Sequence, residues 1–139
     1  SIDAMNLPPG DLSALLANLR YRLQPRFTSS DLELHWNVDL LPVLERLDDK
    51  AMRHLQFMVY GAMSNVMQHA KATVMGIQAF ATPAGVELLI SDNGCGFDTA
   101  LPLKKGLLHM HERAAAIGAV LNLRSEPGRT EVGILIALS

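Results

Sequence analysis

Apolar side chains recur every three or four residues in three segments, at about residues 12–24, 49–70 and 106–117. This spacing places them on one face of an α-helix. The pattern is strongest in the middle segment, where it predicts one buried helix face. That face comprises Met52, Leu55, Val59, Ala62, Val66 and Ala70.

Breakers and capping residues suggest where these helices begin and end. Asp11 or Ser13 can cap the first helix, and Pro25 is expected to end it. Gly118 is expected to follow the last helix as its C-cap. A further short helix is expected over residues 40–47.

Residues 32–38 alternate between apolar and polar side chains, which predicts a strand. Four more strands are expected in the second half of the chain, at residues 73–80, 86–91, 119–124 and 130–138. Short links join the first two and the last two of these, so each pair is predicted to be an antiparallel hairpin. Early helices followed by paired strands favour a two-layer α+β sandwich.

Composition narrows the class of protein. A chain of 139 residues that is 49% hydrophobic can form one domain with a buried core. The 12 Lys and Arg against 14 Asp and Glu give a net charge of −2, which argues against a nucleic-acid polymer as partner. Cys95 is the single cysteine, so no internal disulfide forms. No apolar run is long enough for a predicted membrane span.

Polar residues form a separate stripe on the long helix. Gly61, Asn65 and His69 are four residues apart and therefore share one face, with Gln68 beside it. Taken alone, this cluster favours an ordinary exposed polar face. The functional interpretation is an amide oxygen for a hard cation, with polar groups nearby for phosphates.

Asp92, Gly94 and Gly96 follow a predicted strand. The two glycines let the backbone turn sharply near a ligand, and the carboxylate can accept from the exocyclic amine of a base. An ordinary Asn-Gly turn at Asn93 remains the alternative.

Lys105, Gly106 and Leu107 lie at the start of the last predicted helix. Free backbone N–H groups at a helix start favour an anion, although a plain helix cap after a loop has the same pattern.

The order of these clusters, completed by Gly128-x-Thr130, resembles the N, G1 and G2 boxes of the ATP-binding domain of sensor histidine kinases. The same superfamily contains gyrase, Hsp90 and MutL. The nitrate-sensor-like subfamily is the most similar. Residues 61–70 read Gly-Ala-Met-Ser-Asn-Val-Met-Gln-His-Ala, and residues 106–114 read Gly-Leu-Leu-His-Met-His-Glu-Arg-Ala. The resemblance covers about residues 30–138.

This resemblance implies a Bergerat-type α/β sandwich, with a mixed, mostly antiparallel sheet of about five strands covered on one face by about three helices. It implies that residues 1–29 are an N-terminal segment and the end of the dimerisation helix. Residues 30–139 would then be the ATP-binding catalytic domain, with the ATP lid at about residues 97–105.

The resemblance also implies roles for single residues. Asn65 would hold Mg²⁺, and Asp92 would accept from the adenine amino group. The nucleotide-binding set that the resemblance implies consists of Asn65, His69, Asp92, Gly94, Gly96, Lys105, Gly106, Leu107 and Thr130.

The implied function is that of a two-component sensor protein-histidine kinase, which binds ATP and Mg²⁺ and transfers the γ-phosphoryl group to a histidine. The acceptor is expected upstream of Ser1, because His35 lies in a strand-like alternation. The implied partners are the phosphoacceptor and dimerisation domain of a homodimeric parent and a response regulator. The domain would be cytoplasmic, in a parent anchored in the inner membrane.

Four positions depart from the family pattern. Gly61 replaces the usual acidic residue, so no catalytic residue is assigned, and Gln68 replaces a lysine. His109 replaces a glycine, and the final glycine motif is shortened at residues 128–130. These departures keep open a degenerate, non-catalytic nucleotide-binding or partner-docking module of the same fold. A gyrase-like ATPase is a weaker alternative, because hydrolysis needs the base that Gly61 lacks.

Overall fold

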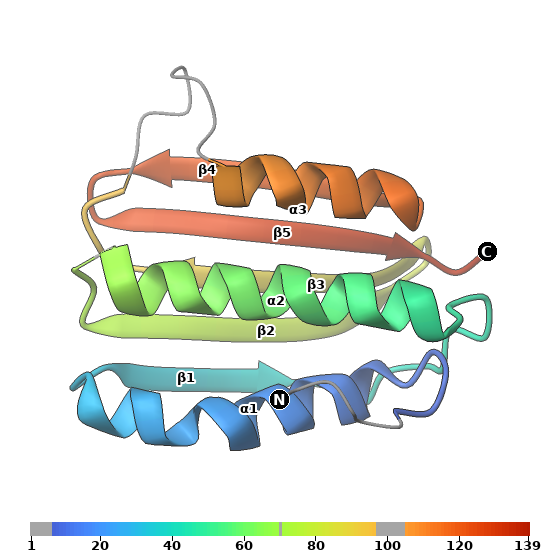
Figure 1. Cartoon of the computed structure of the whole chain (residues 1–139), viewed down its shortest axis with the longest axis horizontal. Helices are drawn as coiled ribbons and strands as arrows, with labels where there is room; N and C mark the ends of the chain where they lie inside the picture. Colours follow the sequence, from blue (N-terminus) through green and yellow to red (C-terminus); the bar gives the residue numbers. More distant parts are fainter. Residues whose placement is uncertain (1–6, 70, 97–104) are drawn as a thin grey trace.

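The computed structural model describes residues 7–69, 71–96 and 105–139. These residues form three helices and five strands (Figure 1). Their order is α1 (Leu12–Ser29), β1 (Glu33–Val38), α2 (Asp49–His69), β2 (Val74–Thr82), β3 (Gly85–Asp92), α3 (Lys105–Ala116), β4 (Ala119–Glu126) and β5 (Arg129–Ala137).

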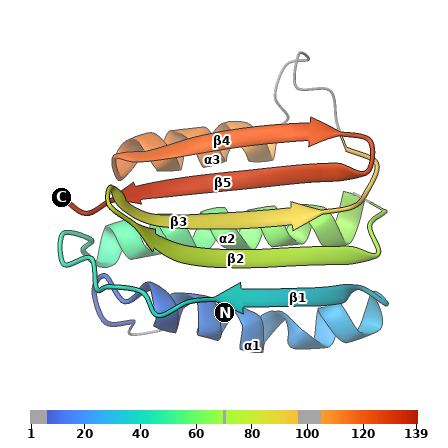
Figure 2. The same cartoon turned by 180° about the vertical axis from the view of Figure 1, so that it is seen from behind.

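The strands form one sheet in the order β1-β2-β3-β5-β4. β1 and β2 are parallel, and the other three pairs are antiparallel. All three helices lie on the same face of this sheet, as the views from its two sides show (Figures 1 and 2). The α+β prediction is therefore confirmed, including the mixed and mostly antiparallel sheet.

Helix α2 lies along the middle of the sheet and carries the buried face that its periodicity predicts. Met52, Leu55, Val59, Ala62 and Val66 are all buried, while Ala70 lies outside the described residues. The carboxylate of Asp48 caps the helix by accepting from the N–H of Ala51 at 2.9 Å. The polar stripe at Asn65 is thereby left facing away from the sheet.

Helix α1 continues past Pro25, so the prediction that proline ends it is wrong. Proline removes one backbone donor, but tertiary contacts hold the last turn in place. Phe27 is buried in the core, and the guanidinium of Arg26 donates to the hydroxyl of Tyr60 on α2 at 3.3 Å. Ser30 closes the helix by donating its N–H to the carbonyl of Arg26 at 3.0 Å.

Residues 40–47 form no helix, which corrects the short helix predicted there. Leu44 and Leu47 both enter the core, and the N–H of Leu44 donates to the carbonyl of Gly10. Arg46 donates to the carbonyls of Ala137 at 2.9 Å and Ile117 at 3.0 Å. These long-range contacts outweigh the weak local preference for a helical turn.

The apolar face of α1 belongs to the same core as α2 and the sheet. The residues that α1 contributes are Leu12, Leu15, Leu16, Leu19, Leu23 and Phe27. Residues 12–29 are therefore packed in one folded unit with the strands. This packing does not test whether residues 1–29 also end a dimerisation helix, so that division of the chain stays a prediction.

The last hairpin is formed as predicted, with β4 and β5 paired from Ala119 to Ala137. Gly118 follows α3 with a φ of 66°, the left-handed conformation expected of a glycine C-cap. No helix in the described part of the chain is both long and apolar enough to cross a membrane.

Candidate nucleotide-binding site

One end of the buried sheet face is polar. In β3, Val86, Leu88 and Ile90 point to the helix-covered side, and Asp92 ends this row two residues later. In β5 the corresponding row begins with Thr130, which pairs directly with Asp92 in the sheet. Both side chains are only 8% exposed. The antiparallel register therefore brings a carboxylate and a hydroxyl together at the end of an otherwise apolar layer.

Asp92 is held in place by its own loop. The N–H of Gly94 donates to its Oδ1 at 2.8 Å. Burial raises the pKa of Asp92 above its ordinary value of 3.8, and the Gly94 hydrogen bond acts in the opposite direction. Thr130 shares a hydrogen bond of 2.7 Å with the hydroxyl of Ser125 on β4. A carboxylate in this position is available to accept from a ligand's amine.

The loop after Asp92 is tied to its neighbours on both sides. The Asn93 side chain accepts from the N–H groups of Thr73 at 2.8 Å and Val74 at 2.9 Å. The carbonyl of Gly94 accepts from the N–H of Gly128 at 2.9 Å. These bonds hold the loop between the start of β2 and the β4–β5 turn.

Gly96 is required by the backbone of this loop. Its φ is 72°, a left-handed conformation that L side chains rarely adopt. A Cβ atom there would lie 2.7 Å from the carbonyl oxygen of Glu126. The fold therefore requires a glycine at position 96 for steric reasons.

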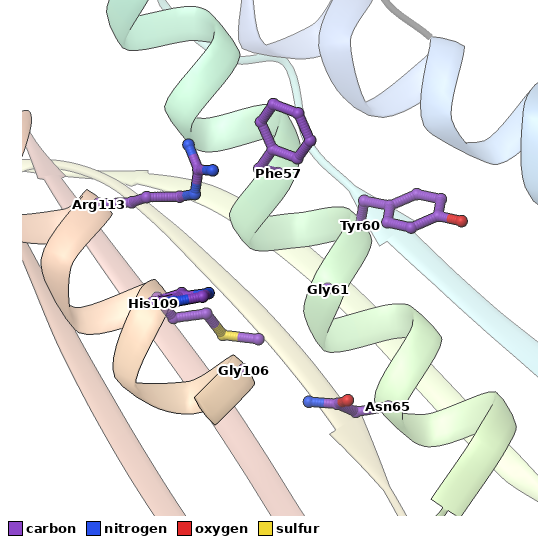
Figure 3. A pocket seen from close by; sticks show the side chains of 8 residues that line it. Phe57, Tyr60, Gly61, Asn65, Gly106, His109 and Arg113 are labelled. Atoms are coloured by element: carbon purple, nitrogen blue, oxygen red, sulfur yellow. The ribbon is translucent and has the colours of Figure 1, made fainter. Parts of the chain in front are cut away.

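A cleft of about 220 Å³ lies between α2 and α3. Asn65 and His109 point into the space between the two helices from opposite sides (Figure 3). Gly61 lies one turn before Asn65, and Gly106 lies at the start of α3. Two of the positions that depart from the family pattern, 61 and 109, therefore line the same cleft.

The far end of the cleft carries positive charge. The guanidinium of Arg113 lies 4.4 Å from the centroid of the Phe57 ring. Its Nη1 lies 3.1 Å from Nδ1 of His54. Burial, followed by the charge of Arg113, lowers the pKa of His54, so its imidazole is neutral at neutral pH and accepts this bond.

The remaining predicted residues lie around the Asp92 loop and the cleft between α2 and α3. His69 is the last residue of α2 and Lys105 the first of α3, although their side chains lie outside the described residues. Leu107 is buried beneath α3, and Gln68 is exposed. The predicted lid lies outside the description except for its last residue.

Sequence reasoning missed four residues that line the cleft. They are Phe57, Tyr60, Met110 and Arg113. Extending the four-residue step of the polar stripe backward from Gly61 reaches Phe57, and the same step from His109 reaches Arg113. The helical spacing therefore contained the signal, but not the fact that the two helices face each other.

A divalent cation would find few protein ligands here. No group of three His, Cys, Asp or Glu residues suited to a metal occurs among the described residues. The side-chain oxygen of Asn65 is a suitable hard ligand for Mg²⁺, which usually retains waters and takes phosphate oxygens as further ligands. The site therefore fits a metal that arrives together with a phosphate ligand.

Comparison with known sequences identifies relatives of one kind. No family model matches the chain. It is 38% identical over 76 residues to the sensor protein VraS of Staphylococcus saprophyticus, covering 53% of this chain and 22% of VraS. It is 28% identical over 110 residues to the sensor histidine kinase LiaS of Bacillus subtilis, covering 77% of this chain and 29% of LiaS. The chain thus spans under a third of these relatives.

Solved structures agree on the fold. The histidine kinase AdeS of Acinetobacter baumannii superposes with a TM-score of 0.81 at 18% identity, covering 97% of this chain and 68% of that one. The ATP-binding domain of PrrB from Mycobacterium tuberculosis gives 0.70 at 22% identity, covering 94% and 96%. Full-length ShkA in complex with AMPPNP gives 0.73 at 20% identity, covering 100% and 33%.

The five-stranded sheet with three helices on one face is the fold of histidine kinase ATP-binding catalytic domains. The chain is a homologue of the sensor histidine kinases. The comparisons do not test membership of the nitrate-sensor-like subfamily, which stays a prediction.

Proposed function

We propose that this chain is the ATP-binding catalytic domain of a two-component sensor protein-histidine kinase. It binds ATP with Mg²⁺ and presents the γ-phosphoryl group to a histidine that lies outside the described fold. The observation that carries this proposal is Asp92, a buried carboxylate held by the Gly94 N–H at the end of the sheet. Such a carboxylate selects a base with an exocyclic amine.

The other predicted residues take their roles around this anchor. Thr130 lies beside Asp92 under the base, and Gly94 and Gly96 keep the backbone close to it. Asn65 would hold Mg²⁺ through its side-chain oxygen, and the metal would supply neutralisation of phosphate charge. Gly106 lines the cleft at the start of α3, where free backbone N–H groups would bind the phosphates.

The relatives support the wider setting. VraS and LiaS are named as sensor proteins, and a sensor kinase works with a phosphoacceptor and dimerisation domain and with a response regulator. We assign the same partners to the parent of this chain, as a homodimer. We place the chain in the cytoplasm, in a parent anchored in the inner membrane.

Titration of the chain with a labelled ATP analogue and Mg²⁺ tests the proposal. Asp92→Asn is expected to weaken binding by about 10- to 100-fold, because it loses a hydrogen bond between a charged acceptor and the base. The matched variant Asp39→Asn removes an exposed carboxylate and is expected to bind as the wild type does. GTP should compete poorly, because guanine carries a carbonyl oxygen at the ring position where adenine carries its amine.

The second candidate is a non-catalytic regulatory module of the same fold. Gly61 favours it, because no side chain at that position can act as a base or polarise an acceptor imidazole. The same titration separates the first candidate from a docking module that binds no nucleotide, and phosphorylation of a histidine by the parent protein separates it from a module that binds nucleotide without catalysis. A folded chain that binds no nucleotide at millimolar concentration contradicts the first candidate and favours the second.

A further inference from the structure

We propose that His109 and Arg113 bind the terminal phosphate of the nucleotide, so that the cleft between α2 and α3 distinguishes ATP from ADP. This inference rests on the proposed function, because it requires a nucleotide whose base lies at Asp92. It assigns a role to the side chains of Arg113 and His109, for which the resemblance implied no role.

The direction of the cleft is the first argument. The Asp92 loop is bonded to Thr73 and Val74, which closely follow the end of α2, so the base site lies at the C-terminal end of that helix (Figure 1). Moving back along α2 reaches Asn65 and then, about 6 Å further, Gly61. A phosphate chain that passes Asn65 therefore extends into the cleft, toward His109.

The charge of the cleft is the second argument. None of its eight lining residues is a carboxylate. In the described part of the chain the ion pairs are His35–Glu33 and Arg129–Glu131, so no acidic side chain neutralises Arg113. Its contacts are with neutral His54 and the Phe57 ring, and neither of these contacts removes its positive charge. A guanidinium presents the planar set of donors that suits phosphate oxygens.

The pairing of Gly61 with His109 is the third argument. In the family pattern, the α2 position carries an acidic residue and the α3 position carries a glycine. In this chain the small residue is Gly61 on α2 and the large one is His109 on α3. Without a carboxylate at residue 61, the cleft has no group that repels phosphate or pairs with Arg113. The exposed imidazole of His109 adds a donor on the opposite wall (Figure 3). The two departures together convert the cleft into an anion site.

The test compares ATP and ADP binding, with Mg²⁺ present, in the wild-type chain and its variants. Arg113→Gln and His109→Ala are each expected to weaken ATP binding by about tenfold and ADP binding by less than about twofold. Arg113→Lys keeps the charge but loses the planar donors, and it should retain part of the preference for ATP.

Matched controls come from the same elements. His111→Ala removes an imidazole two residues from His109 that does not line the cleft, and Arg124→Gln removes an exposed arginine from β4. Both should leave the ratio of ATP to ADP affinity unchanged. Thermal unfolding of each variant identifies a loss of binding that results from a loss of folding.

Two outcomes overturn the inference in distinguishable ways. If the wild type binds both nucleotides but the Arg113 and His109 variants leave the affinity ratio unchanged, or lower both affinities equally, this inference is wrong and the proposed function stands. If the folded wild type binds neither ATP nor ADP, the proposed function fails and the inference fails with it.

Discussion

Two glycines, Gly96 in the Asp92 loop and Gly61 on α2, differ in why they are glycines. Gly96 has a φ of 72°, and a Cβ there would lie 2.7 Å from a backbone oxygen. Gly61 is in regular helix, and a Cβ there would lie 3.3 Å from Cε of Met110, the flexible end of a side chain. The fold demands the first glycine and only tolerates the second.

This difference separates the Asp92 loop from the cleft between α2 and α3. Around Asp92, hydrogen bonds made by Gly94, Asn93 and Gly128 tie the loop to the ends of the neighbouring strands. Exposed side chains such as Asn65 and His109 line the cleft, so substitutions at these positions disturb few core contacts. Departures from the family pattern can therefore accumulate at positions 61 and 109 while the Asp92 loop keeps its motif.

The largest expected effect on stability is that of Gly96→Ala. Left-handed strain and the contact with Glu126 should together lower the free energy of unfolding by about 2–4 kcal/mol. Gly118→Ala is the matched control, because Gly118 has a φ of 66° but no atom within 4 Å of its Cβ. It should lose only about 1–2 kcal/mol in the same urea titration. Equal losses in both variants would show that the steric contact does not matter.

Gly61→Ala is expected to have a smaller effect of opposite sign. Alanine is favoured over glycine inside a helix by about 0.8–1 kcal/mol, and the terminal methyl of Met110 needs to move only slightly. The free energy of unfolding should therefore rise by about 0.5–1 kcal/mol in chemical denaturation. A clear loss of stability would mean that the fold requires Gly61, and the comparison with Gly96 would then be wrong.

The pH dependence of Asp92→Asn is expected to be the most subtle effect. Burial raises the pKa of Asp92 in the folded chain, so its ionisation disfavours folding. The stabilising contribution of the protonated Asp92 side chain is fully present below the unfolded pKa, near 3.8. It is lost as the pH rises through the folded pKa. Asparagine cannot ionise, so the variant should gain stability relative to the wild type as the pH rises above the unfolded pKa, near 3.8.

Thermal unfolding of both proteins over that pH range measures the difference. The exposed-site variant Asp39→Asn should show no comparable trend. A stability difference that is constant with pH would contradict a buried, ionising Asp92.

Much of the geometry of the Asp92 loop could be predicted because its signals are local. A strand followed by Asp92, Gly94 and Gly96 is a short motif, and the conformation that it imposes depends on neighbouring residues. The cleft could be predicted only in part. The sequence placed Asn65 and Gly61 on one helix face. That Phe57 and Arg113 line the same cleft became visible only from the packing of α2 against α3.

By itself, the sequence determined the periodic elements, the two hairpins, the α+β class and the order of the polar clusters. These follow from local spacing, because side chains three or four residues apart share a helix face and alternate residues share a strand face. The tertiary structure decided what depends on distant partners. Burial of Phe27 carried α1 past Pro25, contacts with Gly10 and Ala137 prevented a helix at residues 40–47, and helix packing placed His109 opposite Gly61.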